Sequence, residues 1–482
     1  MRKKPLNILF GSAEITPFAK VGGLADVASA LPRALASLGH KLAVVTPYYG
    51  CVKQKGIKPT GITVSVKMGN RTFRGSFWKG RLSENCTIYF LRHNRLFGRK
   101  NPYGDSKGDY LDNDERFIFF NRALLELPER ISFRPDIVHV NDWHLGLAPA
   151  LIKHSAAGLV KHAKSVFTIH NIAYQGLFPK KSMRLTSLPK SLFNPVGVEW
   201  YEKLGMLKSG IVYADAVTTV SPTYAKEILT PELGFGLEGL LKKRKSSLHG
   251  ILNGIDTKEW NPKTDRLIPR NYDADNIGNK AKCKTALLKE FGLENRTGRP
   301  LIGIVSRIVE QKGFDILQKA GGELMKQDFS LVVLGTGQPE LEKFLLGLQK
   351  RHPERVGVKI GFNNALAHRI EAGSDFFLMP SRFEPCGLNQ MYSLRYGTVP
   401  IVRKTGGLCD TVSRWNPKTG TGSGFRFSNP TPKAMLAALK KSLAAYHDRR
   451  GWKRLVKNGM KRDNSWEKSA LRYSKLYRKL LT

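Results

Sequence analysis

The segment Phe376-Phe377-Leu378-Met379-Pro380-Ser381-Arg382-Phe383-Glu384-Pro385-Cys386-Gly387-Leu388 joins a buried apolar run to a turn that carries one carboxylate, Glu384. Further along, Thr405-Gly406-Gly407-Leu408-Cys409-Asp410-Thr411 follows another apolar run and begins a helix with two glycines. Backbone N–H groups of glycines at a helix start can approach an anion closely. The two turns therefore predict an α/β fold that holds a sugar and a diphosphate side by side at its strand ends.

Similar apolar or β-branched runs recur along the chain, with helical stretches between them. Strands that alternate with helices imply a parallel sheet. A first series covers residues 8–10, 42–45, 137–140, 165–169 and 216–220, and a second covers residues 250–256, 301–305, 329–334, 356–360, 376–379 and 399–402. The polar stretch 257–280, rich in Asn, Asp and Pro, indicates a connecting loop near the boundary.

The length of 482 residues is too great for one ordinary core. We predict two Rossmann-like, doubly wound domains with parallel sheets facing each other across a cleft, over residues 1–249 and 250–458. Residues 459–482 are predicted to supply a C-terminal helix that docks back on the first domain, because apolar residues recur at helical spacing there. Ligands of such sheets bind outside the carboxyl ends of the strands.

The composition excludes several classes of protein. The formal net charge of +40 favours contact with polyanions, but no zinc finger, RRM signature or Arg-Gly repeat accompanies it, so we expect no specific nucleic-acid partner. Association with polyanions stays open on charge alone. No apolar run is long enough for membrane insertion. The five cysteines lack paired spacing and a CxxC motif, which indicates the cytoplasm rather than an oxidising compartment.

Three early segments carry polar or glycine-rich turns. Lys20-Val21-Gly22-Gly23 follows the first strand and begins a helix, and it matches neither a Walker A loop nor a GxGxxG fingerprint. Asp142-Trp143-His144 and His170-Asn171-Ile172-Ala173-Tyr174-Gln175-Gly176 place acids, amides, imidazoles and aromatics at strand ends, where they suit a hydroxyl-rich ligand. The spacing of the imidazoles crosses a strand end rather than one helical face, so we predict no metal.

Ser306-Arg307-Ile308-Val309-Glu310-Gln311-Lys312-Gly313 is another strand-to-turn segment. Arg307 offers a planar fork for phosphate oxygens, and Lys312 offers a compact point charge. Together they could neutralise a departing diphosphate without a metal. A pair of solvated surface cations is the alternative for this segment viewed alone.

In order and detail, these segments resemble bacterial glycogen synthases and plant starch synthases over nearly the whole chain. The resemblance implies the GT-B fold and no metal or other cofactor. It also implies transfer of glucose from ADP-glucose to the nonreducing end of an α-1,4-glucan, such as glycogen or a maltooligosaccharide, with retention of configuration. Two departures, Tyr392 where many related transferases carry a second Glu and Cys409 where Ala is common, remove no charged group that this chemistry needs.

The resemblance also implies roles for single residues, named here by their positions in this sequence. Those at the reaction centre are Glu384, Asp142, His170, Arg307 and Lys312. Those expected to bind the donor are Lys20, Gly22, Gly23, Asn253, Phe362, Thr405, Gly406, Gly407 and Leu408. Those expected to hold the acceptor glucan are Glu14, Tyr103 and Trp143.

Three alternatives stay open at this point. Glu384 is a candidate nucleophile on chemical grounds, whereas the resemblance favours a same-face reaction in which Arg307 and Lys312 stabilise the leaving phosphate. The donor could be UDP-glucose, or the product could be a different short α-glucan, since the phosphate-binding residues decide neither the base nor the acceptor. A non-catalytic carbohydrate- or polyanion-binding protein on the same scaffold is weakly encouraged by the charge.

Overall fold

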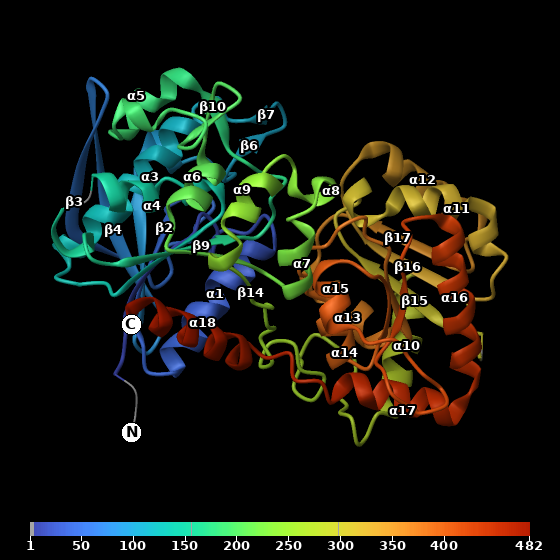
Figure 1. Cartoon of the computed structure of the whole chain (residues 1–482). Coiled ribbons are helices and arrows are strands. Elements are labelled where there is room, and N and C mark those ends of the chain that lie inside the picture. Colours follow the sequence, from blue (N-terminus) through green and yellow to red (C-terminus); the bar gives the residue numbers. More distant parts are fainter. Residues whose placement is uncertain (1–3, 156, 297) are drawn as a thin grey trace. The chain divides into compact units, whose positions relative to one another are not determined.

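The computed structural model describes residues 4–155, 157–296 and 298–482, and the chain divides into two compact units (Figure 1). Unit 1 comprises Met1–Asn253 and Trp466–Thr482, and unit 2 comprises Gly254–Ser465. The domain boundaries expected after residues 249 and 458 stay predictions.

Unit 1 is built on a mixed sheet that has nine strands within the described residues. All pairs from β14 to β5 are parallel, whereas β5-β4 and β4-β3 are antiparallel. In spatial order the strands are β14 Leu248–Gly250, β13 Ala216–Thr219, β9 Lys164–Ile169, β8 Ile137–Asn141, β1 Asn7–Gly11, β2 Lys41–Pro47, β5 Cys86–Arg92, β4 Arg71–Ser83 and β3 Lys58–Met68. The central strands are buried over nearly their full length, as expected for parallel strands covered on both faces.

The helices of unit 1 connect these strands and cover the sheet. They are α1 Gly23–Ser37, α2 Asn94–Phe97, α3 Asn113–Arg130, α4 Ala148–His154, α5 Met183–Thr186, α6 Met206–Tyr213, α7 Pro222–Glu227, α8 Pro231–Gly234, α9 Glu238–Lys243 and α18 Trp466–Leu481. Two small sheets contain β6 Gly104–Asp105 with β7 Gly108–Asp109, and β10 Leu177–Pro179, β12 Lys203–Gly205 and β11 Glu199–Trp200. A helix capable of crossing a membrane is not found in the described part of the chain.

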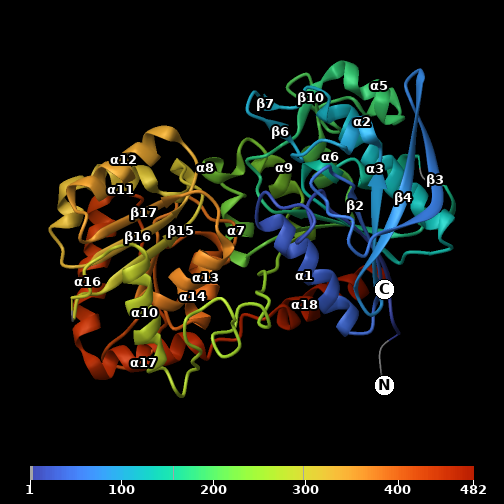
Figure 2. The same ribbon diagram turned by 180° about the vertical axis from the view of Figure 1, so that it is seen from behind.

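The C-terminal helix α18 belongs to unit 1, where it packs against α1 (Figures 1 and 2). A buried chain of hydrogen bonds ties it to the sheet. Tyr477 Oη lies 2.6 Å from His139 Nδ1, and His139 Nε2 lies 2.6 Å from Thr168 Oγ1. Burial lowers the pKa of His139 to about 3, so this imidazole is neutral and bonds through one donor and one acceptor nitrogen.

Replacing Tyr477 with Phe is expected to lower the free energy of unfolding by about 1–3 kcal/mol, because it leaves a buried imidazole nitrogen unpaired. Urea unfolding of the purified protein measures this loss. Leu471→Ala on the same helix is the control, since Leu471 is 50% exposed and should cost much less. Equal stability of Y477F and the wild type would show that the hydrogen bond does not hold α18 in place.

Unit 2 contains a parallel sheet of six described strands, in the order β17-β16-β15-β18-β19-β20. Their bounds in that order are Val356–Ile360, Ser330–Gly335, Leu301–Val305, Phe376–Met379, Val399–Arg403 and Phe425–Phe427. The helices are α10 Asn279–Glu290, α11 Phe314–Met325, α12 Pro339–Arg351, α13 Asn364–Gly373, α14 Asn389–Arg395, α15 Gly406–Thr411, α16 Pro432–His447 and α17 Arg449–Met460. Two doubly wound α/β units with parallel sheets are thus confirmed.

Two details of the strand prediction are wrong. The second series does not begin at residues 250–256: Gly250 ends β14 of unit 1, and the chain then leaves the sheet toward the unit boundary at Asn253. The antiparallel strands β3 and β4, a long ribbon in Figure 2, were not predicted. Alternating polar and apolar residues at 63–68 are the signal that could have revealed β3, since its outer side chains meet solvent.

Candidate functional site

Both sheets have one point at which the strand order reverses, and both place the predicted site residues there. In unit 2 the reversal lies between β15 and β18, and in unit 1 it lies between β1 and β8. At such a point the following connections leave toward opposite faces, so a crevice forms at the carboxyl ends of the strands. Lys312 follows β15 and Glu384 follows β18, whereas Glu14 follows β1 and Asp142 follows β8.

The centre of the unit 2 site is an ion pair between Lys312 and Glu384. Lys312 Nζ donates to Glu384 Oε2 at 2.6 Å, and Ser381 Oγ donates to the same oxygen at 3.1 Å. Glu384 is only 5% exposed, so the pair is largely shielded from water. A hydrogen bond between two charged groups is stronger than a neutral one. The pair fixes both side chains and leaves Glu384 Oε1 without a partner among the described residues.

Glycines allow the turns of unit 2 to pack this closely. Gly406 has φ 42°, and a Cβ there would lie 2.0 Å from the Glu384 carbonyl oxygen. A Cβ on Gly407 would lie 2.1 Å from the Cys386 carbonyl oxygen, and the Gly407 N–H donates to the Glu384 carbonyl at 3.2 Å. A Cβ on Gly313, at φ 81°, would also meet a backbone carbonyl. The backbone around Glu384 is therefore set by turns that no larger residue can enter unchanged.

The other predicted residues of unit 2 lie at the same edge of the sheet. Arg307 is exposed after β15, and its Nη2 donates to Gln311 Oε1 at 3.3 Å. Phe362 follows β17 and is 82% exposed. Thr405 precedes α15 and is buried. Leu408 packs its side chain into the core of unit 2, so only its backbone is suited to a ligand.

In unit 1, the turn at the start of α1 holds a carboxylate of the chain itself. Glu14 Oε2 accepts hydrogen bonds from the N–H groups of Val21 at 2.6 Å and Gly22 at 2.9 Å, and Tyr103 Oη donates to Glu14 Oε1 at 2.7 Å. Lys20 forms an ion pair with Asp26 at 2.7 Å. Gly23 is the first residue of α1, where backbone N–H groups have no partner within the helix. The predicted anion-binding turn thus already binds one anion.

Asp142 occupies a strained position next to this turn. Its φ is 56°, a conformation that costs a non-glycine residue about 1–3 kcal/mol and that clusters at functional sites. Its Oδ1 accepts the His170 N–H at 2.7 Å. Burial raises the pKa of Asp142 to about 7, and the charge of Glu14 acts in the same direction. Asp142 can therefore change its protonation state near neutral pH.

The imidazole of His170 is held in one tautomer. Asn141 Nδ2 donates to the Gly11 carbonyl at 2.8 Å, which turns Asn141 Oδ1 toward His170 Nε2 at 2.9 Å. Nε2 must therefore carry the proton, and Nδ1 is the acceptor. Burial lowers the pKa of His170 to about 3, so the ring is neutral.

The pKa of Asp142 gives a testable pH dependence of stability. Between its unfolded value, about 4, and about 7, the folded state keeps the proton that the unfolded state loses, so stability falls as pH rises. Asp142→Asn removes this loss, so the difference in unfolding free energy between the variant and the wild type should shift in the variant's favour by about 2–3 kcal/mol from about pH 5 to about pH 8. Urea unfolding at both pH values measures the gain, and the exposed Asp109→Asn should show none. A gain that does not change with pH would contradict the expectation.

A cluster of aromatic rings lies beside the Glu14 carboxylate. The His144 ring stacks 4.6 Å from Tyr103 and 4.0 Å from Trp143, measured between centroids. Both nitrogens of His144 are buried without a hydrogen-bond partner among the described residues. Gly176 lies against Trp143, where a Cβ would be 2.4 Å from the indole. Rings and a carboxylate in one place suit a sugar, which presents both C–H faces and hydroxyls.

Asn253, the last residue of the first segment of unit 1, also has an unsatisfied acceptor. It is 5% exposed, and its Oδ1 has no hydrogen-bond partner in the described part of the chain. Buried acceptors without partners are costly, and a ligand hydroxyl would satisfy this one.

Three contributors to the two sites were not singled out from the sequence. Ser381 lies three residues before Glu384 in the segment quoted first, Asn141 directly precedes Asp142, and His144 lies in the quoted segment Asp142-Trp143-His144. Their partners are 3, 29 and about 40 residues away, so only the strand-end rule could have indicated them. No group of three or more His, Cys, Asp or Glu side chains suited to a metal is found among the described residues. Metal independence stays a prediction.

Two protein-family models match this chain, one in each half. The model of the starch synthase catalytic domain matches residues 7–243, and the model of group 1 glycosyl transferases matches residues 288–462. The chain is 48% identical to a glycogen synthase of Anaeromyxobacter sp. (strain Fw109-5), covering 98% of this chain and 99% of that protein. It is also 48% identical to a glycogen synthase of Myxococcus xanthus (strain DK1622), covering 99% and 100%.

Solved structures extend the similarity to the fold. The catalytic domain of starch synthase IV from Arabidopsis thaliana, bound to ADP and acarbose, is 33% identical and matches with a TM-score of 0.91 over 99% of both chains. A sucrose-phosphate synthase from Thermosynechococcus elongatus is 17% identical with a TM-score of 0.60 over 99% of both chains, a likeness of fold alone. The GT-B fold class is thereby confirmed.

Proposed function

Because the chain belongs to the glycogen synthase family and is a glucosyltransferase of glycogen synthesis, we propose that its donor is ADP-glucose and that Lys312 and Glu384 form the centre of its donor site. The observation that carries the assignment is the shielded Lys312–Glu384 pair at the switch point of unit 2. The similar starch synthase structure that holds ADP and acarbose supports an adenine nucleotide and a glucan as ligands.

Within unit 2, each group has a role that its chemistry allows. Arg307 and Lys312 bind the distal phosphate, Arg307 with a planar fork and Lys312 with a point charge. Glu384 Oε1 accepts hydroxyls of the transferred glucose. The residues that present backbone groups to sugar or phosphate are Thr405, Gly406, Gly407 and Leu408. The exposed Phe362 ring offers a stacking surface for adenine.

Within unit 1, the aromatic cluster and Glu14 bind the acceptor glucan, with Tyr103 and Trp143 against its sugar rings. Asp142, His170 and Asn253 contact the transferred glucose, and the unsatisfied Asn253 Oδ1 accepts a hydroxyl. Lys20, Gly22 and Gly23 line the diphosphate. Because the Gly22 N–H already bonds Glu14, the Gly23 N–H is the better donor to a phosphate oxygen.

For the reaction we propose a same-face displacement. The bond between glucose C1 and the β-phosphate oxygen breaks, and ADP leaves with the electron pair. The leaving phosphate takes the proton from the acceptor 4-hydroxyl, whose oxygen bonds C1 on the same face. Lys312 and Arg307 stabilise the charge that develops on the phosphate, an electrostatic contribution that is commonly the largest in catalysis.

The deciding experiment compares ADP-glucose and UDP-glucose as donors to glycogen and maltooligosaccharides, with EDTA present. We expect strong incorporation from ADP-glucose and little from UDP-glucose. Incorporation from UDP-glucose alone would overturn the donor, and loss of activity in EDTA would overturn metal independence. No incorporation from either donor would favour a carbohydrate-binding protein instead.

A location and a partner complete the proposal. The five cysteines, all among the described residues, form no disulfide, which supports a location in the reducing cytoplasm. Association with general polyanions rests on the net charge alone. Heparin binding that is lost at moderate salt while glucosyl transfer continues would identify it as nonspecific.

A further inference from the structure

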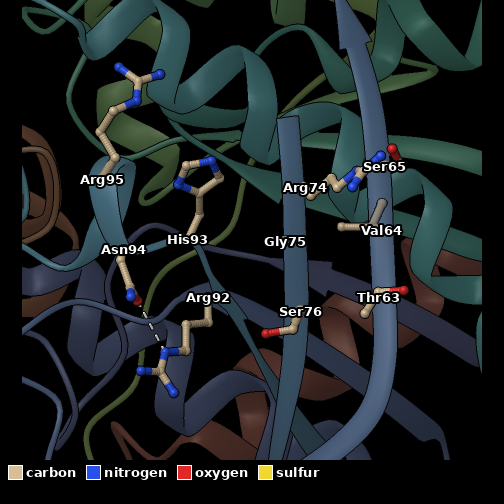
Figure 3. Close-up of a pocket in the computed structure, with 10 residues that line it drawn as sticks. All are labelled: Thr63, Val64, Ser65, Arg74, Gly75, Ser76, Arg92, His93, Asn94 and Arg95. Atoms are coloured by element: carbon tan, nitrogen blue, oxygen red, sulfur yellow. Dashed lines mark hydrogen bonds between the residues drawn. The ribbon is translucent and has the colours of Figure 1, made fainter. Parts of the chain in front are cut away.

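A basic hollow of about 790 Å³ lies on the antiparallel part of the unit 1 sheet (Figure 3). We call it the arginine hollow and define it by Ser65, Arg74, Ser76, Arg92, Asn94 and Arg95, which line it. They come from β3, β4, β5 and α2. None of them belongs to the donor or acceptor groups assigned above.

The positive charge of the arginine hollow is not neutralised by its surroundings. Among the described residues that line it there is no Asp or Glu. Arg74 makes no side-chain hydrogen bond or ion pair within the described part of the chain. Arg92 Nε donates to the neutral Asn94 Oδ1 at 3.2 Å, and its guanidinium lies 5.2 Å from the centre of the Trp78 ring. Two guanidinium charges therefore lack a carboxylate partner.

The third arginine of the hollow, Arg95, shares its carboxylate partner with another arginine. Arg95 forms an ion pair with Glu115, and Arg71 forms an ion pair with the same carboxylate. One negative charge thus faces two positive ones. Arg74 and Arg92 alone therefore give the hollow two uncompensated positive charges, which favour a dianionic ligand such as a phosphate monoester.

Strand register places neutral hydrogen-bonding groups between the arginines. Ser76 lies opposite Thr63 on one side and Arg92 on the other, and Ser65 lies opposite Arg74. Figure 3 shows these side chains on neighbouring strands, with Asn94 bonded to Arg92. Hydroxyls and an amide both donate and accept, as recognition of sugar hydroxyls requires.

We propose that the arginine hollow binds a phosphate monoester carried by a sugar, either a free hexose phosphate or a phosphorylated residue of a glucan. Guanidinium groups match phosphate oxygens in shape and charge, and the adjacent serines and Asn94 form hydrogen bonds with the sugar hydroxyls. A hollow rather than a long basic stripe favours this ligand over a nucleic acid. The arginine hollow shares no residue with the proposed donor site, and this proposal does not depend on that site.

The test is calorimetric binding of glucose 6-phosphate, glucose, phosphorylated maltodextrin and heparin to the full chain. The key variant is Arg74→Ala/Arg92→Ala. The matched control is Arg81→Ala, an exposed arginine on the same strand β4 but outside the hollow. Ser65→Asp, which places a carboxylate opposite Arg74, is a second variant on another strand. A loss of affinity in Arg307→Ala would show that the ligand binds at the proposed donor site instead.

We expect the wild type to bind glucose 6-phosphate and not glucose, and the double variant to lose at least about tenfold in affinity for the phosphate sugar. Ser65→Asp should lose a similar factor, whereas Arg81→Ala and Arg307→Ala should keep wild-type affinity. The double variant should retain the wild-type glucosyl transfer rate when no phosphate sugar is added. If the protein binds phosphorylated maltodextrin but not glucose 6-phosphate, the ligand of the hollow is a phosphorylated residue of a glucan rather than a free hexose phosphate.

Several outcomes would overturn the proposal. One is unchanged glucose 6-phosphate affinity in the double variant and in Ser65→Asp. Another is an equal loss in Arg81→Ala, which would show a general charge effect. A third is binding of heparin alone, which would make this face a polyanion surface. Urea unfolding of each variant separates lost binding from lost folding.

Discussion

Lys312→Ala is expected to lower kcat for glucosyl transfer by about 10²–10³-fold, the usual effect of removing one preorganised group that stabilises transition-state charge. The position of Lys312 is fixed by its 2.6 Å hydrogen bond to the buried Glu384. A preorganised cation needs no rearrangement as charge develops on the leaving phosphate. Steady-state rates with ADP-glucose and glycogen measure the loss.

A second variant separates this effect from damage to the site. Lys312→Ala leaves the Glu384 carboxylate buried without its cation, which is costly by itself. The double variant Lys312→Ala/Glu384→Gln removes that unpaired charge. If lost charge stabilisation is the cause, the double variant stays as slow as the single one, and a recovered rate would contradict our expectation. Lys319→Ala, an exposed cation of α11, should be unaffected.

A further variant, Glu384→Ala, compared with Lys312→Ala, decides between the two retaining mechanisms. A covalent route needs the Glu384 carboxylate as nucleophile, so Glu384→Ala would abolish turnover. The same-face route uses Glu384 only to bind and orient the sugar. Substantial turnover in Glu384→Ala together with almost none in Lys312→Ala would exclude the nucleophile.

The strand-to-turn segments were the part of the site that local sequence could predict. Apolar runs mark parallel strands, and the strand-end rule then indicates the turns that carry Arg307, Lys312, Glu384 and Asp142. The fold class followed from the same alternation. These features depend on neighbours in sequence, which is why they were accessible before the structure.

Contacts between distant segments could not be predicted. Glu14 and Tyr103 are 89 residues apart, and only the fold shows that their hydrogen bond and the N–H groups at the start of α1 share one carboxylate. His139 lies in the predicted strand 137–140, and only the fold shows that its buried ring bonds Thr168 of β9 and Tyr477 of α18. Spacing along the chain contains no information about such partners.

Gly406→Ala is expected to reduce both stability and activity, because the site depends on a turn that tolerates no Cβ. The left-handed φ of 42° costs an alanine about 1–2 kcal/mol, and its Cβ would meet the Glu384 carbonyl at 2.0 Å. Since a displacement of about 1 Å in a positioned group can lower a rate about 10²-fold, we expect a loss of that order in kcat. Urea unfolding and steady-state kinetics measure the two effects.

The control for this substitution is Gly347→Ala in α12 of the same unit. There a Cβ would meet only the end of the Arg351 side chain at 3.5 Å, and a helical alanine should gain about 0.5–1 kcal/mol over glycine. Opposite signs for the two glycines would tie the loss to the geometry of the Glu384 turn. If Gly406→Ala instead kept wild-type kcat, the backbone beside Glu384 could move without consequence, and preorganisation of the Lys312–Glu384 pair would not explain the rate.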